Sequence, residues 1–392
     1  MGLACLVSEL VRVGLVQAEF VHLKRISTMS SPLVLAFDLS EMVAQVLFSA
    51  KTKGAEGIVV LRAALLLFAR RCCDKRKGAP GLRAAPPSDD ECRLAAESVA
   101  RAVSLYLTAA VAMNIIPVVV IESQIDPNSA HPKADLARKR GQRRAVADAE
   151  CFRCWLRWSD RSPGCTQSVE GEALDLLPNT SGLRSDTFFI DAIRTQTSIL
   201  GVPVLEPASC CRVEHIAIEF DAMVHRLLLE GTIDGVFSAD QDIVARVVLD
   251  HELWLRETPP VVVRSLAPRS LDHHVDAVLR PRAAGSAAPL FMSRERCTEG
   301  FRVLSSYMRT DYSATSCRIG PRTLAGVLIG DASSLERVRA ADAMVAGGGA
   351  FKDIVERKRR LNERGFSPCD LSDINEGDMN WSMLKEARNK HE

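Results

Sequence analysis

Four short apolar runs alternate with longer helical segments along this 392-residue chain, and this alternation limits the possible fold more than any other feature. The runs span 32–38, 115–122, 201–206 and 233–240, and each ends in a carboxylate. A short run without polar residues is typical of a central parallel strand, because helices cover both faces of a parallel sheet. The sequence therefore predicts an α/β fold with a mostly parallel central sheet flanked by helices.

Helical and irregular segments separate these runs. Helices are expected at 55–71, 92–113, 214–230 and repeatedly after residue 294, ending in a charged amphipathic stretch at 351–364. Two further apolar segments, 252–256 and 260–264, are expected to be edge strands, and 77–91 a loop. Residues 1–30 show no clean period, and the tail from 365 is polar and expected to be poorly ordered.

The composition bears on the cellular compartment and on the kind of partner that the protein can bind. Lys and Arg number 50 against 49 Asp and Glu, so total charge neither favours nor excludes a polyanionic partner. The 12 cysteines form no regular framework, which favours a reducing, intracellular compartment. The most apolar stretch, 107–121, is too short to span a bilayer and is interrupted by Asn114 and Pro117, so no membrane is expected.

Acidic residues gather where the expected strands end. Ligands in open parallel sheets bind beyond the carboxyl ends of the strands, so acids from different strands can meet there. Clustered carboxylates repel one another unless cations neutralise them, and oxygen ligands favour Mg²⁺ or Mn²⁺. Each acid alone is explained more simply as a solvated loop end or a helix cap, so the prediction depends on the set. The set contains Asp38, Glu122, Glu219, Asp221, Asp240, Asp242 and Asp311.

The order of these acids resembles the flap endonuclease/XPG family of structure-specific 5′ nucleases over most of residues 1–345. Counting back from Asp240, nine residues reach Gly231 and ten more reach Asp221, as between that family's Glu-x-Glu and Asp-x-Asp pairs. Other segments are similar to family motifs: Met1-Gly2-Leu3, Phe37-Asp38-Leu39-Ser40, 117–122, the basic run 133–144, 201–206, Thr310-Asp311-Tyr312, and Arg318-Ile319-Gly320-Pro321-Arg322.

The resemblance implies a PIN-like 5′-nuclease core with an inserted helical arch and a helix–two-turn–helix element. The implied regions are 1–125 and 189–345 for the nuclease, 126–188 for the arch-like insertion, about 300–335 for the helix–two-turn–helix, and 346–392 for a charged C-terminal extension. Several residues depart from the family pattern: Glu122 stands for Asp, Asp221 for Glu, Ala44 for a stacking Tyr, and Arg318 for Gly.

The implied chemistry is two-metal hydrolysis of a DNA phosphodiester by a metal-bound hydroxide, with Mg²⁺ as the ion and Mn²⁺ as a substitute. Asp38, Glu122, Glu219 and Asp221 would hold one ion, and Asp240, Asp242 and Asp311 the second. Candidates for electrophilic assistance are Lys133, Arg138, Lys139 and Arg140, which a solvated basic helix face explains equally well. Duplex contacts are expected from Gly2, Arg318, Gly320 and Arg322, with K⁺ at the helix–two-turn–helix.

The implied substrate is branched or nicked duplex DNA with a 5′ single strand, cleaved by an endonuclease/exonuclease of DNA replication, repair or recombination. The expected location is the nucleus or another site of DNA replication. The tail carries no recognisable sliding-clamp motif. Two alternatives stay open: an RNA endonuclease resembling viral host-shutoff proteins, and a catalytically weak nucleic-acid-binding relative.

Overall fold

The computed structural model describes residues 3, 5–22, 32–50, 54–75, 86–122, 125–126, 128–129, 131, 133–159, 183, 186–206, 219–256, 260–263, 274–281, 292–312 and 319–369. The chain forms two compact units, each assembled from separate segments. Unit 1 contains 1–36, 125–136 and 206–375, and unit 2 contains 37–124, 137–205 and 376–392. The chain passes from unit 2 to unit 1 after Gln124 and returns to unit 2 after Leu136.

The sheet of unit 1 has the strand order β1-β7-β6-β5-β2. β1 (Val16–His22) and β7 (His274–Pro281) pair antiparallel, as do β7 and β6 (Val261–Val263), while β5 (Gly235–Phe237) runs parallel to β6. β2 (Leu33–Asp38) contributes its first four residues to this unit. Only glycine fits at position 235, because a Cβ there would lie 2.2 Å from the carbonyl oxygen of Val261 in the neighbouring strand.

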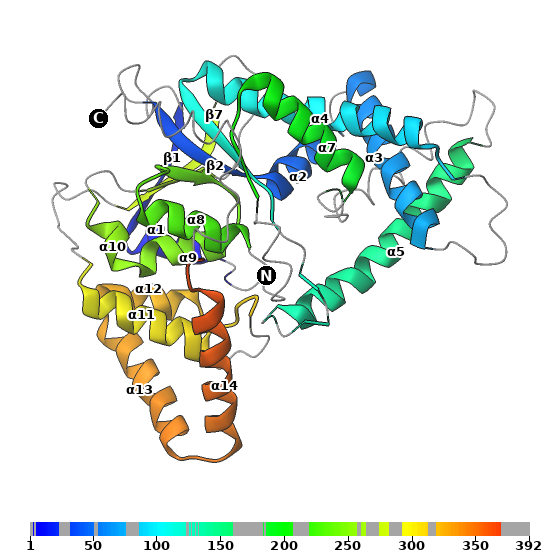
Figure 1. Cartoon of the computed structure of the whole chain (residues 1–392). Helices are drawn as coiled ribbons and strands as arrows, with labels where there is room; N and C mark the ends of the chain where they lie inside the picture. Colours follow the sequence, from blue (N-terminus) through cyan, green and yellow to red (C-terminus); the bar gives the residue numbers. More distant parts are fainter. Residues whose placement is uncertain are drawn as a thin grey trace. The chain divides into compact units, whose positions relative to one another are not determined.

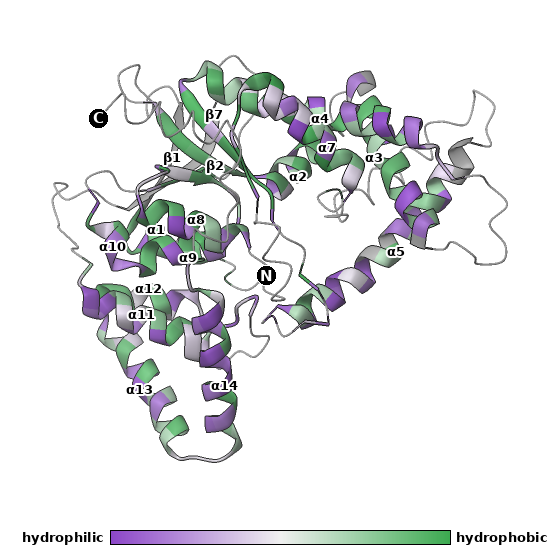
Figure 2. Ribbon diagram, in the orientation of Figure 1, coloured by the Kyte–Doolittle hydropathy of each residue, from purple (hydrophilic) through white to green (hydrophobic). Residues whose placement is uncertain are grey.

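Helices pack around this sheet in unit 1. α1 (Leu6–Arg12) contacts β1 and α9 (Gln241–Leu249), and α9 also contacts α8 (Phe220–Leu229), α10 (His251–Trp254) and α11 (Arg294–Tyr307). Almost every residue of α9 is buried, so this helix forms the centre of the unit. α12 (Pro321–Ile329), α13 (Ala332–Ala346) and α14 (Ala350–Gly365) follow, with α13 and α14 forming the orange-to-red helical hairpin of Figure 1. Figure 2 shows α14 as mostly hydrophilic.

Unit 2 continues the order β2-β3-β4, with β3 (Ile115–Val120) parallel to β4 (Val204–Leu205). Its helices are α2 (Leu39–Ala50), α3 (Gly54–Lys75), α4 (Asp89–Ala112), α7 (Thr187–Leu200) and most of α5 (Ala134–Ser159). α4 begins at a capping box between Ser88 and Glu91, which satisfies free amides of its first turn. The bidentate ion pair between Arg71 of α3 and Asp148 holds α5 against α3.

One helix among the described residues, α4, is long and apolar enough to cross a membrane by length and composition. Helices in protein cores meet the same criteria, and α4 buries one face against α3 and α7. Its burial in unit 2 accounts for its apolar composition without a bilayer.

The predicted α/β class is confirmed: five strands run parallel and helices flank them, while β1 and β7 add antiparallel pairing at one edge. Several local expectations are wrong. Residues 251–254 form the helix α10 rather than a strand, because the Asp250 side chain caps the amide of Glu252. The segment 260–264 contains β6, which lies between β5 and β7 and is not an edge strand. β1 and β7 are strands that the sequence patterns did not predict.

Candidate active site

Five of the seven predicted acids belong to unit 1, and four of them lie at the starts of two neighbouring helices. Glu219 is the N-cap of α8 and Asp221 lies in its first turn, while Asp240 is the N-cap of α9 and Asp242 lies in its first turn. The fifth, Asp311, is in the turn after α11. The positive end of a helix dipole favours carboxylates at such positions. Contact between α8 and α9 brings the two pairs into one region.

Asp242 is buried and the neighbouring Asp240 is exposed, and the carboxyl groups of both have a raised pKa. Burial, and then the negative charge of Asp240, raises the pKa of Asp242 to about 8. Partial loss of hydration around the carboxyl group, and then the charge of Asp221, raises the pKa of Asp240 to about 6. Asp311 adds to both shifts, so four carboxylates act on one another electrostatically. We call Asp221, Asp240, Asp242 and Asp311 the acid cluster.

Lys133 supplies a buried positive charge beside the acid cluster. Its ammonium group donates a hydrogen bond to Oε2 of Glu219 and lies 4.3 Å from the ring centroid of Tyr312. Only 8% of Lys133 is exposed, and burial alone would lower its pKa. The charges of Glu219 and Asp221 outweigh this effect and raise the pKa of Lys133, so the side chain is a permanent cation.

Two buried residues around Glu219 had no predicted function. Tyr312 donates its hydroxyl to Glu219 Oε2 at 3.1 Å, and the buried guanidinium of Arg246 donates to the same hydroxyl at 3.0 Å. The sequence could have indicated Tyr312, because it follows the predicted ligand Asp311 in the Thr-Asp-Tyr motif. No sequence pattern indicated a role for Arg246, because a single arginine in an apolar helix is not distinguished by its neighbours in the sequence.

The donor chemistry of this region fits a hard divalent cation. Asp242 Oδ2 and Glu219 Oε1 are buried and make no hydrogen bond to the residues that the structure describes. His131 Nε2 lies 3.5 Å from Glu219 Oε1. Buried carboxylate oxygens without a hydrogen bond, beside carboxyl groups with raised pKa values, are well matched by Mg²⁺ or Mn²⁺. Across the described ranges, no three His, Cys, Asp or Glu side chains are already arranged to hold one ion. An ion would therefore have to draw the carboxylates together.

The other two predicted acids lie in unit 2. Asp38 ends β2, and its Oδ1 accepts the amide of Ser40 at 2.8 Å and that of Glu41 at 3.4 Å, which caps the start of α2. Glu122 follows the neighbouring strand β3. Within unit 2 the two acids thus stand at the carboxyl ends of adjacent strands, as the sequence pattern predicted.

The predicted basic residues fall into three groups. Lys133 is buried in unit 1, whereas Arg138, Lys139 and Arg140 are exposed on the part of α5 that belongs to unit 2. Gly320 is the N-cap of α12, with Pro321 at its first position and Arg322 exposed in its first turn. Gly2 and Arg318 lie outside the described residues.

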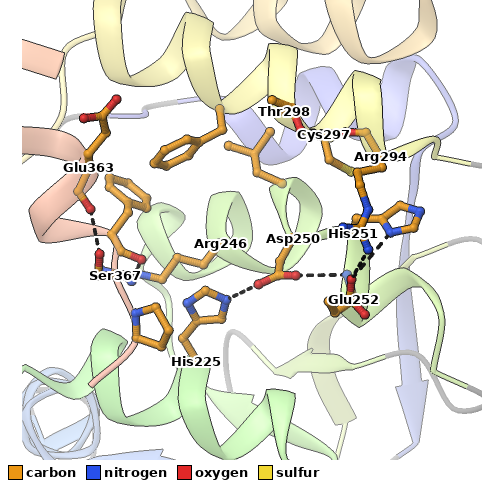
Figure 3. Close-up of a pocket in the computed structure, with 14 residues that line it drawn as sticks. His225, Arg246, Asp250, His251, Glu252, Arg294, Cys297, Thr298, Glu363 and Ser367 are labelled. Atoms are coloured by element: carbon orange, nitrogen blue, oxygen red, sulfur yellow. Dashed lines mark hydrogen bonds and ion pairs between the residues drawn. The ribbon is translucent and has the colours of Figure 1, made fainter. Parts of the chain in front are cut away.

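A separate pocket of about 560 Å³ lies in unit 1 between the ends of α8, α9, α10, α11 and α14 (Figure 3). His225 shares a hydrogen bond of 2.7 Å with Asp250, and Arg294 pairs with Glu252 at 2.7 Å. These charges of opposite sign pair within the pocket wall, so the pocket does not define one class of ligand, and we assign none to it. It shares Arg246 and Phe366 with the surroundings of Tyr312.

Comparison with known proteins adds no family to this picture. No protein-family model matches the chain, and no curated protein matches it significantly. The functional interpretation therefore depends on the site itself and on the sequence motifs.

The raised pKa of Asp242 predicts a pH-dependent stability in a chelator such as EDTA. The folded protein retains the Asp242 proton up to about pH 8, while the unfolded chain loses it near pH 4. Stability should therefore fall as pH rises between these values. Asp242→Asn removes this titration and should stabilise the protein at pH 8 relative to pH 5 by at least about 1 kcal/mol, compared with the wild type. Urea unfolding in EDTA at the two pH values measures the difference.

Asp250→Asn provides a control of opposite sign. Burial opposes ionisation of Asp250, but the hydrogen bond with His225, the charge of His225 and hydrogen bonds from the amides of Glu252 and Leu253 together outweigh burial and lower the pKa of Asp250. This carboxylate therefore contributes stability that is present above pH 4 and lost as pH falls, so its replacement should cost stability at pH 8. Equal pH slopes in the wild type and Asp242→Asn would contradict the assignment of Asp242.

Proposed function

We propose that this protein is a metal-dependent phosphodiesterase that cleaves DNA near a 5′ flap, nick or junction. The observation that carries the proposal is the acid cluster at the starts of α8 and α9, with a buried lysine beside it. Mutual repulsion among these carboxylates, of which Asp221 and Asp242 are buried, is electrostatically unfavourable unless the cluster serves to bind cations. The parallel sheet is compatible with a PIN-like core, which the sequence motifs favour.

The residues of unit 1 divide into two roles. Asp221, Asp240, Asp242 and Asp311 would hold the divalent ion, and Asp38 and Glu122 stay predicted ligands on the basis of the motifs. A bound Mg²⁺ supplies a hydroxide nucleophile and neutralises charge on the phosphate. Lys133 adds a fixed positive charge beside the cluster, suited to stabilising negative charge that develops on a phosphate oxygen. Glu219 orients Lys133 through their ion pair.

Exposed basic residues support a nucleic-acid substrate. Arg138, Lys139, Arg140 and Arg143 are exposed on α5, which we propose as part of the arch. The first turn of α12 begins at Gly320 and carries the exposed Arg322, whose positive charge is suited to a phosphate of the duplex backbone. We propose this segment as the second half of the helix–two-turn–helix. Exposed cations on α14, including Arg357, Arg359 and Arg360, could neutralise further phosphates.

Cleavage of matched substrates tests the proposal. A labelled 5′-flap duplex, a nicked duplex, a blunt duplex and single-stranded RNA of the flap sequence are incubated with the full chain in Mg²⁺ or EDTA. We expect Mg²⁺-dependent product from the flap or nicked duplex and none in EDTA. Product from RNA alone would replace the proposal by an RNA endonuclease. Binding without product from any substrate would indicate a non-catalytic nucleic-acid-binding protein.

A further inference from the structure

We propose that Tyr312 and Arg246 are positioning residues that hold the Lys133–Glu219 pair and connect it to the last turn of α14. Neither residue was expected to act at the site. Both are buried, and each makes polar contacts in two directions, toward the charged pair and toward the end of the helix.

Tyr312 contacts both members of the pair. Its hydroxyl donates to Glu219 Oε2, the oxygen that also accepts from Lys133, and its ring lies beneath the Lys133 ammonium at 4.3 Å from the ring centroid. A hydrogen bond to a carboxylate is stronger than one between neutral groups, and a buried ring attracts a cation. One side chain thus restricts both the carboxylate and the ammonium.

Arg246 extends this contact to the C-terminal end of α14. Its guanidinium donates to the carbonyl oxygens of Gly365 at 2.7 Å and Phe366 at 2.9 Å, and to the Tyr312 hydroxyl at 3.0 Å. It also lies over the Phe366 ring, 4.7 Å from the centroid. The carbonyl oxygens at a helix end lack partners within the helix, so Arg246 satisfies them while fixing the Tyr312 hydroxyl.

Close packing allows little freedom at this junction. A Cβ at Gly365 would lie 2.2 Å from Cδ1 of Tyr312, so only glycine lets the helix approach the ring. Asn362 lies fully buried one turn earlier in α14. Its side-chain oxygen accepts a hydrogen bond from the hydroxyl of Thr310, and its side-chain nitrogen donates to the carbonyl oxygen of Ser305 at 2.7 Å. The turn that carries Asp311 and Tyr312 is therefore held by α14. A shift of that helix would move Tyr312 and so change its contact with Lys133.

Tyr312→Phe tests the inference, with Tyr307→Phe as a matched control. Both tyrosines are buried in unit 1 and bond a carboxylate, but Tyr307 donates to Asp342 and has no contact with Glu219. Tyr312→Phe keeps the ring and removes only the hydroxyl. The first readout is the rate at which a water-soluble amine-acylating reagent modifies Lys133, followed by peptide mass spectrometry on the full chain.

We expect Tyr312→Phe to raise the Lys133 acylation rate by about tenfold, as loss of a charge-assisted hydrogen bond implies. The control should leave it at the wild-type value. Equal rates in the two variants would overturn the inference. Faster hydrogen exchange at Gly365 and Phe366 in Tyr312→Phe alone would support the connection to α14, and unchanged exchange there would refute that connection.

The catalytic consequence rests on the proposed function, and a second readout separates the two. In flap cleavage, Tyr312→Phe should lower kcat by about tenfold with KM unchanged, because the exposed basic residues on α5 and α12 are untouched. A higher KM at constant kcat would contradict a positioning role. If wild-type protein cleaves nothing while the acylation difference persists, the proposed function fails and the positioning of Lys133 stands.

Discussion

Replacing Asp240 by asparagine should lower the rate of flap cleavage by a factor of about 10³ while leaving duplex binding almost unchanged. Asp240 caps α9 by accepting the amide of Asp242 at 2.9 Å, and asparagine caps helices equally well, so the fold should be retained. The substitution removes one negative charge from the acid cluster, next to the buried Asp242. Single-turnover cleavage and a binding titration, both in Mg²⁺, measure the two effects separately.

Asp331→Asn is the control for this prediction. Asp331 also caps a helix of unit 1, accepting the amide of Ser334 at 2.9 Å, but it takes no part in the acid cluster. Its replacement should leave cleavage unchanged. If Asp240→Asn cleaves as fast as Asp331→Asn, the acid cluster does not bind the catalytic ion.

Replacing Lys133 by methionine should destabilise the protein by roughly 3 kcal/mol in EDTA, because it removes the ion-pair partner of the buried Glu219 carboxylate. Methionine retains the apolar stem against Tyr312, so the loss reports the charge. Mn²⁺ or Mg²⁺ should restore part of this stability, since a bound ion supplies positive charge to the same acids. Urea unfolding with and without the ion gives both values.

Lys352→Met removes a lysine from an exposed ion pair on α14, 3.9 Å from Glu356. Exposed pairs contribute little, so this control should change stability by less than about 0.5 kcal/mol and should not respond to the ion. Similar losses for the two lysines would show that Lys133 is not the counter-ion of the cluster.

The sequence predicted the parallel sheet because its strands are short apolar runs between helices. Leu33–Asp38 and Ile115–Val120 are typical of such strands, since both are apolar up to an acid, Asp38 at the end of the first and Glu122 two residues after the second. The same pattern predicted the acids at helix starts, which local chemistry explains: Asp38 and Asp240 bond amides of the helices that follow them. Features that depend on residues close together in the sequence could therefore be predicted.

Features that depend on distant residues were not. β1 and β7 pair with each other across more than 250 residues of sequence, and neither has the clean apolar period of a central strand. Arg246 acquires its surroundings from Tyr312, Gly365 and Phe366, and its burial could not be foreseen from a helix that reads as QDIVARVVL. Lys133 was predicted among several basic residues, and only tertiary contacts distinguish it from its exposed neighbours on α5.

The interleaving of the two units sets an order of events during synthesis. Lys133 leaves the ribosome with the short 125–136 segment, well before Glu219 and still longer before Tyr312 and Gly365. Until the last of these residues has been synthesised, Lys133 lacks its complete set of contacts in unit 1 and the carboxylates are not yet buried. The charged centre is therefore assembled last, once nearly the whole polypeptide is available, and a prematurely terminated chain would carry its acids in water.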